Sequence, residues 1–136
     1  MERENFSSGR PWEAVAGYSR VVKVGRSVHV AGTTATDPAG NVVGGDDLYA
    51  QTIQTLRNIE VALGMAGAGL ADVVRTRMFV TDMTRWQQAA RAHGELFGAI
   101  RPASTLVGVT RLVAPQMLIE IEADAVIPEG RPESRS

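Results

Sequence analysis

Three carboxylates at alternate positions near the C-terminus are the residues whose spacing most directly suggests chemistry. Glu120, Glu122 and Asp124 lie in the run "LIEIEADAVI", and alternate residues of a strand point to the same face of a sheet. The side chains of Glu120 and Glu122 would then stand about 7 Å apart, which suits a carboxylate pair. The simpler interpretation is a polar sheet face, and the spacing leaves both open.

Other residue types that carry chemistry are scarce. The chain contains two histidines, His29 and His93, and no cysteine, so neither a histidine cluster nor a thiolate site for a metal is expected. His93 falls on the apolar stripe of a predicted helix and is interpreted as a packed residue rather than a base. The sequence has no nucleophile elbow, Walker loop or kinase signature.

Length and charge limit the classes of function. The 136 residues fit one domain. Fourteen basic against fifteen acidic residues give a net charge of -1, which disfavours nucleic acid as a partner. The N-terminus lacks the apolar core of a signal peptide, and no run approaches the length that a membrane span needs. We expect a cytoplasmic protein with no membrane partner.

The first half of the chain predicts a hairpin followed by a helix. Two β-branched runs in "RVVKVGRSVHVAGTT", residues 20–34, meet at Gly25 and Arg26, as in a tight turn. From Leu48 to about Ala66 apolar residues recur every three or four positions, and Asp46 or Asp47 can cap the first turn.

The second half predicts a strand, a helix and two more strands. Residues 73–82 alternate, and the set predicted for one face is Val74, Thr76, Met78 and Val80. A helix follows to Gly98, with a capping box formed by Thr84 and Gln87. Residues 104–112 and 118–127 read as strands. The fold class is therefore α+β, a mixed β-sheet with two helices packed on one face.

The sheet face without helices is predicted to be mixed in character. It would carry Arg75, Arg77, Glu120, Glu122, Phe79 and His29. Such a face suits contact with another subunit, where cross-strand arginine–glutamate pairs would be partly desolvated. We therefore expect a homo-oligomer, and surface ion pairs of small energy are the alternative.

The run "RPASTLVGVTRLVAPQMLIEIEADAV", residues 101–126, closely resembles the signature of the YjgF/RidA family. "GYSR", "VHVAGTT", "LRNIEVAL", "VVRTRMFVTDM" and "HGELFG" resemble further segments of that family in order. The resemblance covers residues 15–127 and leaves residues 1–14 as an N-terminal extension and residues 128–136 as a disordered tail. It implies a chorismate-mutase-like fold and a homotrimer with a small-molecule cleft at each subunit interface.

The resemblance also implies an activity and the residues that perform it. Family members with deaminase activity hydrolyse 2-imino acids and their enamine tautomers to 2-keto acids and ammonia, with no cofactor. A glutamate that positions the attacking water matches Glu120, and an aromatic residue that lines the cleft matches Tyr18. An arginine of the signature pairs with the carboxylate of the substrate.

This chain departs from the family pattern at that arginine. Counting back from Arg111 and Leu112, the arginine position is Ser104, whose hydroxyl is neutral and cannot form a charged bidentate pair. Arg101 stands three residues earlier, either as a substitute that reaches the cleft or as a structural arginine at a corner.

Two further cleft positions carry a methyl group in place of a polar one. A family serine is replaced by Ala31 and a helix asparagine by Ala90. With Leu106 beside them, these residues favour a less acidic and more apolar imine or enamine as substrate.

Three functions remain open from the sequence. The first is an imine or enamine deaminase that binds a small metabolite, and the second is a non-catalytic ligand-binding or regulatory module on the same scaffold. The third, an endoribonuclease, is disfavoured by the net charge and by the lack of a basic, aromatic strand face.

Overall fold

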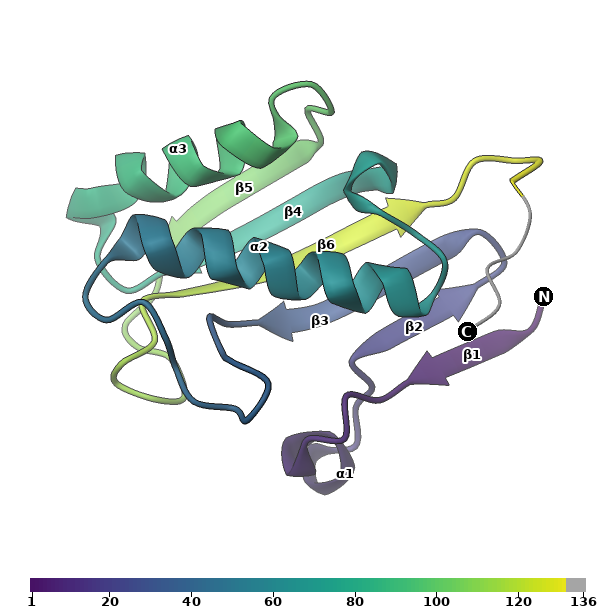
Figure 1. Cartoon of the computed structure of the whole chain (residues 1–136), viewed down its shortest axis with the longest axis horizontal. Helices are drawn as coiled ribbons and strands as arrows, with labels where there is room; N and C mark the ends of the chain where they lie inside the picture. Colours follow the sequence, from purple (N-terminus) through teal and green to yellow (C-terminus); the bar gives the residue numbers. More distant parts are fainter. Residues whose placement is uncertain (132–136) are drawn as a thin grey trace.

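Six strands form one sheet in the computed structural model, which describes residues 1–131 (Figure 1). The strands lie in the order β1-β2-β3-β6-β4-β5, and neighbours are antiparallel except β4 and β5, which are parallel. Their bounds are β1 Arg3–Phe6, β2 Val21–Val24, β3 Ser27–Thr33, β4 Val73–Val80, β5 Ala103–Gly108 and β6 Ile119–Val126. The strand at the centre, β6, carries the row of carboxylates.

The predicted hairpin is confirmed as β2 and β3. Val21 pairs with Val30 and Val24 with Ser27 across a two-residue turn. Gly25 in that turn has a φ of 59°, a conformation that glycine adopts without steric cost. The hairpin presents Val21, Val28 and Val30 to the core and His29 to the opposite face.

The first predicted helix is confirmed as α2, Leu48–Met65. The carboxylate of Asp47 accepts a hydrogen bond of 3.0 Å from the backbone N–H of Ala50, so Asp47 is the N-cap. The helix ends where Gly67 takes a φ of 80°, which lets the chain turn back towards β4.

Two details of the next strand and helix differ from the prediction. The register between β4 and β6 shifts between Val73 and Arg75, so Val73 is buried while Val74 is 47% exposed. Helix α3 covers Trp86–Phe97 and has no capping box at Thr84. Instead Asp82 accepts a hydrogen bond from the N–H of Thr84 and begins a 3₁₀ turn that leads into α3.

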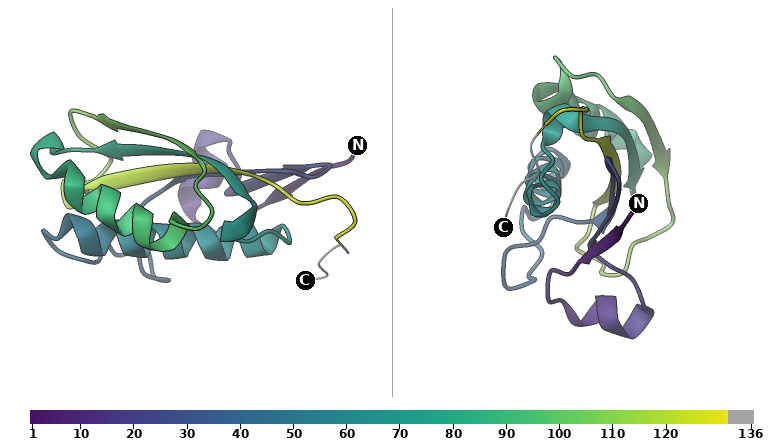
Figure 2. Two further views of the ribbon diagram at one scale, coloured as in Figure 1. Left: turned by 90° about the horizontal axis from the view of Figure 1, so that it is seen from above. Right: turned by 90° about the vertical axis from the view of Figure 1, so that its right-hand side faces the viewer.

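Helices α2 and α3 cover one face of the sheet, as predicted (Figure 2). Their apolar sides bury the helix-facing residues of the central strands. The largest fully buried side chains of this layer come from α2, α3 and β6, and they are Leu48, Leu56, Ile59, Leu63, Phe97, Ile119 and Ile121. Burial of this kind stabilises by about 25 cal/mol per Å² of apolar surface, so this layer dominates the stability of the domain.

Residues 1–14, which the sequence does not mark as strand or helix, add β1 and most of the short helix α1, Pro11–Ala16. Strand β1 pairs with β2 along the edge of the sheet. Glu13 of α1 is buried, accepts hydrogen bonds from the N–H and hydroxyl of Ser8, and lies 3.8 Å from Nε of Arg20. These contacts attach the segment to the hairpin.

The described part of the C-terminal segment contacts the body of the domain. Arg131 forms two hydrogen bonds to the buried carboxylate of Asp72, with Nη2 2.8 Å from Oδ1. The predicted disordered tail covers residues 128–136, and its residues 132–136 lie outside the described residues.

Candidate functional site

Glu120 lies on the sheet face that the helices leave open. Its neighbours Ile119 and Ile121 are fully buried against the helices, so the alternation of β6 directs Glu120 to the other side. Phe79 of β4 stands directly opposite in the register. The Glu120 side chain is half-buried there.

Gly32 makes the room that the Glu120 carboxylate occupies. The register between β3 and β6 shifts between Val30 and Thr33, and Gly32 lies within this irregular stretch. A Cβ atom added to Gly32 would overlap the carboxylate of Glu120. The sequence signal was a glycine at the end of a β-branched run, which marks a bulge or a close approach, but our sequence interpretation did not include Gly32.

Arg20 holds the same stretch of β3 in place. Its guanidinium donates hydrogen bonds of 2.7 Å to the carbonyl of Gly32 and 3.4 Å to that of Ala31. The Tyr18 ring lies beside it, with the guanidinium 5.7 Å from the ring centroid and the hydroxyl 3.5 Å from Nη2. Tyr18, Ala31 and Glu120, all predicted site residues, are therefore brought to one end of the open face, together with Arg20, which the prediction missed.

The pKa of Glu120 is raised above its usual value. Burial is the main cause, the neighbouring charge of Glu122 adds to it, and the positive charge of Arg20 opposes it in part. A carboxyl group with a raised pKa holds its proton more readily, which suits a group that takes a proton from water and gives it back.

Glu122 and Asp124 have charged partners, so the three carboxylates are not equivalent. Arg77 lies 3.7 Å from Glu122 and 3.0 Å from Asp124, and Nδ1 of His29 lies 2.7 Å from Asp124. The predicted cross-strand arginine–glutamate pair is thus present as Arg77 and Glu122. Glu120 has no such ion-pair partner among the described residues, so a symmetrical pair of Glu120 and Glu122 is not formed.

The remaining predicted site residues lie elsewhere in the chain. Ser104 and Leu106 of β5 pair with Thr76 and Met78 of β4, both of which are buried on the helix side. Leu106 packs against the core, and Ser104 is hydrogen-bonded to Thr76. Both side chains therefore belong to the helix-covered side of the sheet, opposite to Glu120.

Ala90 and Arg101 belong to α3 and to the corner between α3 and β5. Ala90 is in the middle of α3, and Arg101 follows its end. Arg101 has a φ of 57°, its N–H donates to the carbonyl of Phe97, and its side chain is exposed. This backbone geometry places Arg101 at the helix-to-strand corner, and one chain does not bring it to Glu120.

His93 is packed, as interpreted, and it also has a polar partner. Its ring stacks at a tilt of 40° on Phe97, with centroids 4.6 Å apart. Its Nε2 lies 2.9 Å from the hydroxyl of Thr76. Burial lowers the pKa of His93, which favours the neutral imidazole.

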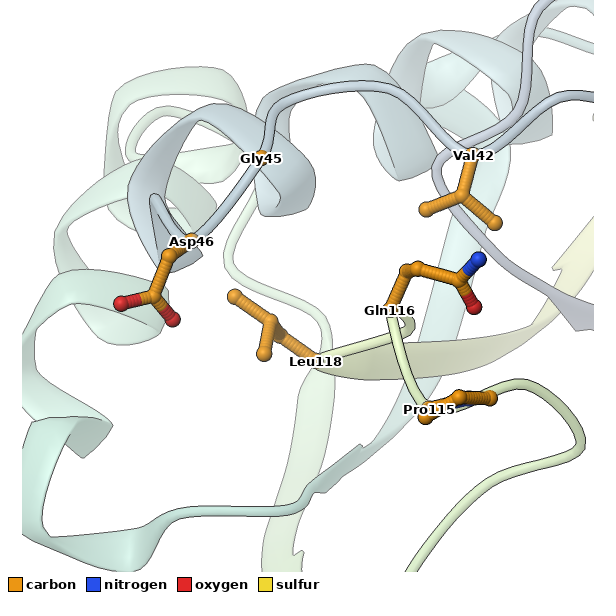
Figure 3. Close-up of a pocket in the computed structure, with 6 residues that line it drawn as sticks. All are labelled: Val42, Gly45, Asp46, Pro115, Gln116 and Leu118. Carbon is orange, nitrogen blue, oxygen red and sulfur yellow. The ribbon is translucent and has the colours of Figure 1, made fainter.

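A pocket of about 280 Å³ lies away from these residues, between the loop before α2 and the turn before β6 (Figure 3). Its lining residues are Val42, Gly45, Asp46, Pro115, Gln116 and Leu118. The buried Gln51 joins its two walls through hydrogen bonds to the carbonyls of Gly45 and Gln116. None of the predicted site residues lines it.

Residues 1–131 contain no group of three or more histidine, cysteine or acidic side chains that could hold a metal ion. Across the same residues, no helix has both the length and the apolar character to cross a membrane.

Comparison with known proteins gives consistent matches along the chain. The sequence profile of the family described as "Endoribonuclease L-PSP" matches residues 9–127. A RutC family protein of Pyrococcus abyssi is 35% identical over 126 residues, which cover 92% of this chain and 98% of the relative. An uncharacterized protein of Streptomyces coelicolor is 36% identical over 119 residues, 87% of each chain.

A solved structure has the same architecture. The crystal structure of a Mycobacterium tuberculosis member of the YjgF/YER057c/UK114 family superposes with a TM-score of 0.84 and 52% identity, over 93% of this chain and 100% of that one. The fold thus agrees with the resemblance drawn from residues 101–126. The chain belongs to the YjgF/RidA family, the family that the matching profile describes as endoribonuclease L-PSP.

Proposed function

We propose that the protein is a homotrimer that binds a small metabolite in clefts between subunits and hydrolyses reactive imines or enamines to carbonyl compounds and ammonia. The observation that carries this proposal is the environment of Glu120. Its carboxyl is half-buried, has a raised pKa and lies against Gly32 on a sheet face that no helix covers.

The two groups of site residues support a site completed by a second subunit. Glu120, Tyr18 and Ala31 belong to the open face, whereas Ser104 and Leu106 belong to the opposite side of the edge strand β5. Because one sheet separates the groups, a single chain cannot bring them together around one ligand. A neighbouring copy that lays its β5 edge against this open face would do so.

The proposed reaction needs only water and the carboxylate of Glu120. The carboxylate takes a proton as the oxygen of water forms a bond to the C=N carbon, which gives a carbinolamine. Starting from the protonated imine, Glu120 gives this proton to the carbinolamine nitrogen and then takes the hydroxyl proton as the C=O bond forms and the C–N bond breaks, so that ammonia leaves and a carbonyl remains. The imine carbon is already electrophilic, and the proposal includes no cofactor.

The test is ammonia release from freshly generated imines. We expect Glu120→Gln to lower the rate by about 10² or more, the usual contribution of a positioned acid–base group. Glu122→Gln is the matched control, because Glu122 is on the same face but is paired with Arg77. Equal rates for wild type and Glu120→Gln would overturn the catalytic role.

A non-catalytic ligand-binding module is the second candidate, favoured by the methyl groups of Ala31 and Ala90 and the neutral Ser104. Ligand binding without ammonia release from any imine would support it. The family description names a third activity, endoribonuclease, although the net charge of this chain is -1. Salt-dependent binding and cleavage of single-stranded RNA would support that activity instead.

A further inference from the structure

Ser104 is the outer end of a chain of three side chains that the proposed reaction does not use. The hydroxyl oxygen of Thr76 lies 2.8 Å from Oγ of Ser104 and 2.9 Å from Nε2 of His93. Thr76 is fully buried, His93 is half-buried, and Ser104 is exposed on the edge strand β5. Thr76 and His93 thus orient an exposed hydroxyl.

This chain of hydrogen bonds carries no charge. Burial lowers the pKa of His93, so its imidazole is neutral near pH 7. Within residues 1–131, no lysine or arginine side chain forms a hydrogen bond or ion pair with Ser104, Thr76 or His93. A ligand that meets Ser104 therefore meets a neutral, oriented hydroxyl.

The direction in which the Thr76 hydroxyl donates its proton decides whether Ser104 can donate a hydrogen bond to a ligand or accept one from it. When Thr76 donates to Ser104, Thr76 accepts from the Nε2–H of His93, and the Ser104 proton is free to bind an acceptor. When the order is reversed, Thr76 donates to Nε2, Ser104 donates to Thr76, and the lone pairs of Ser104 can accept. Both orders are neutral, and they differ in the tautomer of His93 and in the direction in which the two hydroxyl groups donate.

We propose that Ser104, oriented by Thr76 and His93, selects ligands that present an uncharged carboxamide rather than a carboxylate. A primary carboxamide has a carbonyl acceptor and N–H donors, so it satisfies Ser104 in either order of the hydrogen bonds. A carboxylate has acceptors alone, and Ser104 with the two side chains bonded to it offers no charge to replace the solvation that the carboxylate loses. The inference rests on the proposed function, because it assigns a substrate class to the same cleft.

The experiment compares two ligands of one shape, 2-oxobutanamide and 2-oxobutanoate, by titration calorimetry on the full chain. We expect wild type to bind the amide about tenfold more tightly than the acid, a difference that one oriented hydrogen bond can supply. Thr76→Val removes the connection without changing the shape of the residue, and Ser104→Ala removes the exposed hydroxyl. Both should bring the ratio of the two affinities close to one.

Two further variants distinguish a loss of ligand preference from a loss of the folded state. Ser104→Thr keeps the hydroxyl and should keep the preference for the amide. His93→Phe keeps an aromatic ring against Phe97 and should lower the preference even if Thr76→Val fails to fold. Thermal unfolding of each variant reports its folded state independently of the affinity ratio.

The outcomes distinguish failure of this inference from failure of the proposed function. Tighter binding of the acid to wild type, or an unchanged preference in both Ser104→Ala and His93→Phe, overturns the inference and leaves the proposed cleft standing. Binding of neither ligand overturns the proposed binding site and the inference with it.

Discussion

At the scale of single residues, Glu120 differs from its neighbours on β6 in what surrounds it. Glu122 and Asp124 lie within 4 Å of Arg77, and Asp124 also contacts His29. The carboxylate of Glu120 instead rests against Gly32, with a raised pKa. The difference arises from partners and burial, because all three residues share one strand and one face.

Replacement of Gly32 by alanine tests the fit around this carboxylate. The added methyl group would overlap the present position of the Glu120 side chain and push it away. We expect kcat/KM for ammonia release to fall by about a hundredfold, the usual cost of misplacing a catalytic group by about 1 Å. Gly64→Ala is the control, because no atom lies within 4 Å of a Cβ atom at that position. Equal losses in both variants would point to general destabilisation.

The pH dependence of activity follows from the direction of the Glu120 pKa shift. The carboxylate is the form that accepts a proton, so activity should rise as pH rises through the pKa of Glu120, at a midpoint above the usual value of 4.5. Glu122→Gln removes one of the charges that raise this pKa and should move the midpoint down. A profile of kcat/KM against pH gives both midpoints, and a midpoint that does not move in Glu122→Gln would contradict this explanation.

At the scale of elements, buried polar side chains attach the loops to the helices. Gln51 of α2 is fully buried, and its amide nitrogen donates to the carbonyls of Gly45 and Gln116. Its amide oxygen accepts from the N–H of Leu118, just before β6. One side chain therefore satisfies three backbone groups from two loops that are far apart in the sequence.

Gln51→Leu is expected to destabilise the domain by about 2–4 kcal/mol, because each buried backbone group left without a partner costs about 1–3 kcal/mol and the loops can relax in part. The free energy of unfolding from urea titration measures this loss. Gln54→Leu, also in α2, removes a single part-buried hydrogen bond to Asn58 and should cost about 1 kcal/mol or less. A similar loss in both variants would show that the contacts to the loops contribute little.

At the scale of the whole molecule, the sheet has one face covered by helices and one face that is open (Figure 2). The open face combines the Arg77, Glu122 and Asp124 cluster with Phe79 and the half-buried Glu120. A face of mixed polarity next to an exposed edge strand, β5, is suited to contact with further copies of the chain.

The proposed trimer makes a prediction about mass in solution. Wild type should sediment at three times the mass of the 14.5 kDa chain. Arg77→Glu would place a third negative charge beside Glu122 and Asp124 and should shift the mass towards the monomer at micromolar concentration. Arg57→Glu, on the exposed side of α2, is the control and should remain trimeric. A monomeric wild type would remove the cleft on which the proposed function depends.

Local patterns in the sequence were enough to predict most elements. The alternation in residues 118–127 and the helical period after Leu48 identify β6 and α2, because period two and period 3.6 are properties of neighbouring residues. Two of the predictions that the structure corrects, Val74 on the helix-facing side of β4 and Thr84 as the helix cap, have a physical cause. The first depends on the shift of register between β4 and β6, which is set by pairing with a strand far away in the sequence. The second depends on which of two neighbouring polar residues caps the turn, and Asp82 accepts the hydrogen bond from the N–H of Thr84.

By itself, the sequence determined the fold class, the open sheet face and Glu120 as the candidate catalytic group. The tertiary structure alone decided which carboxylate is distinct, since Gly32, Arg20 and Glu120 are brought together by pairing between strands that are far apart in the sequence. It also decided that Ser104, Thr76 and His93 form one hydrogen-bonded chain across β5, β4 and α3. Such contacts follow from the packing of the whole domain, because hydrogen bonds between distant residues form only where the fold brings their atoms within about 3 Å.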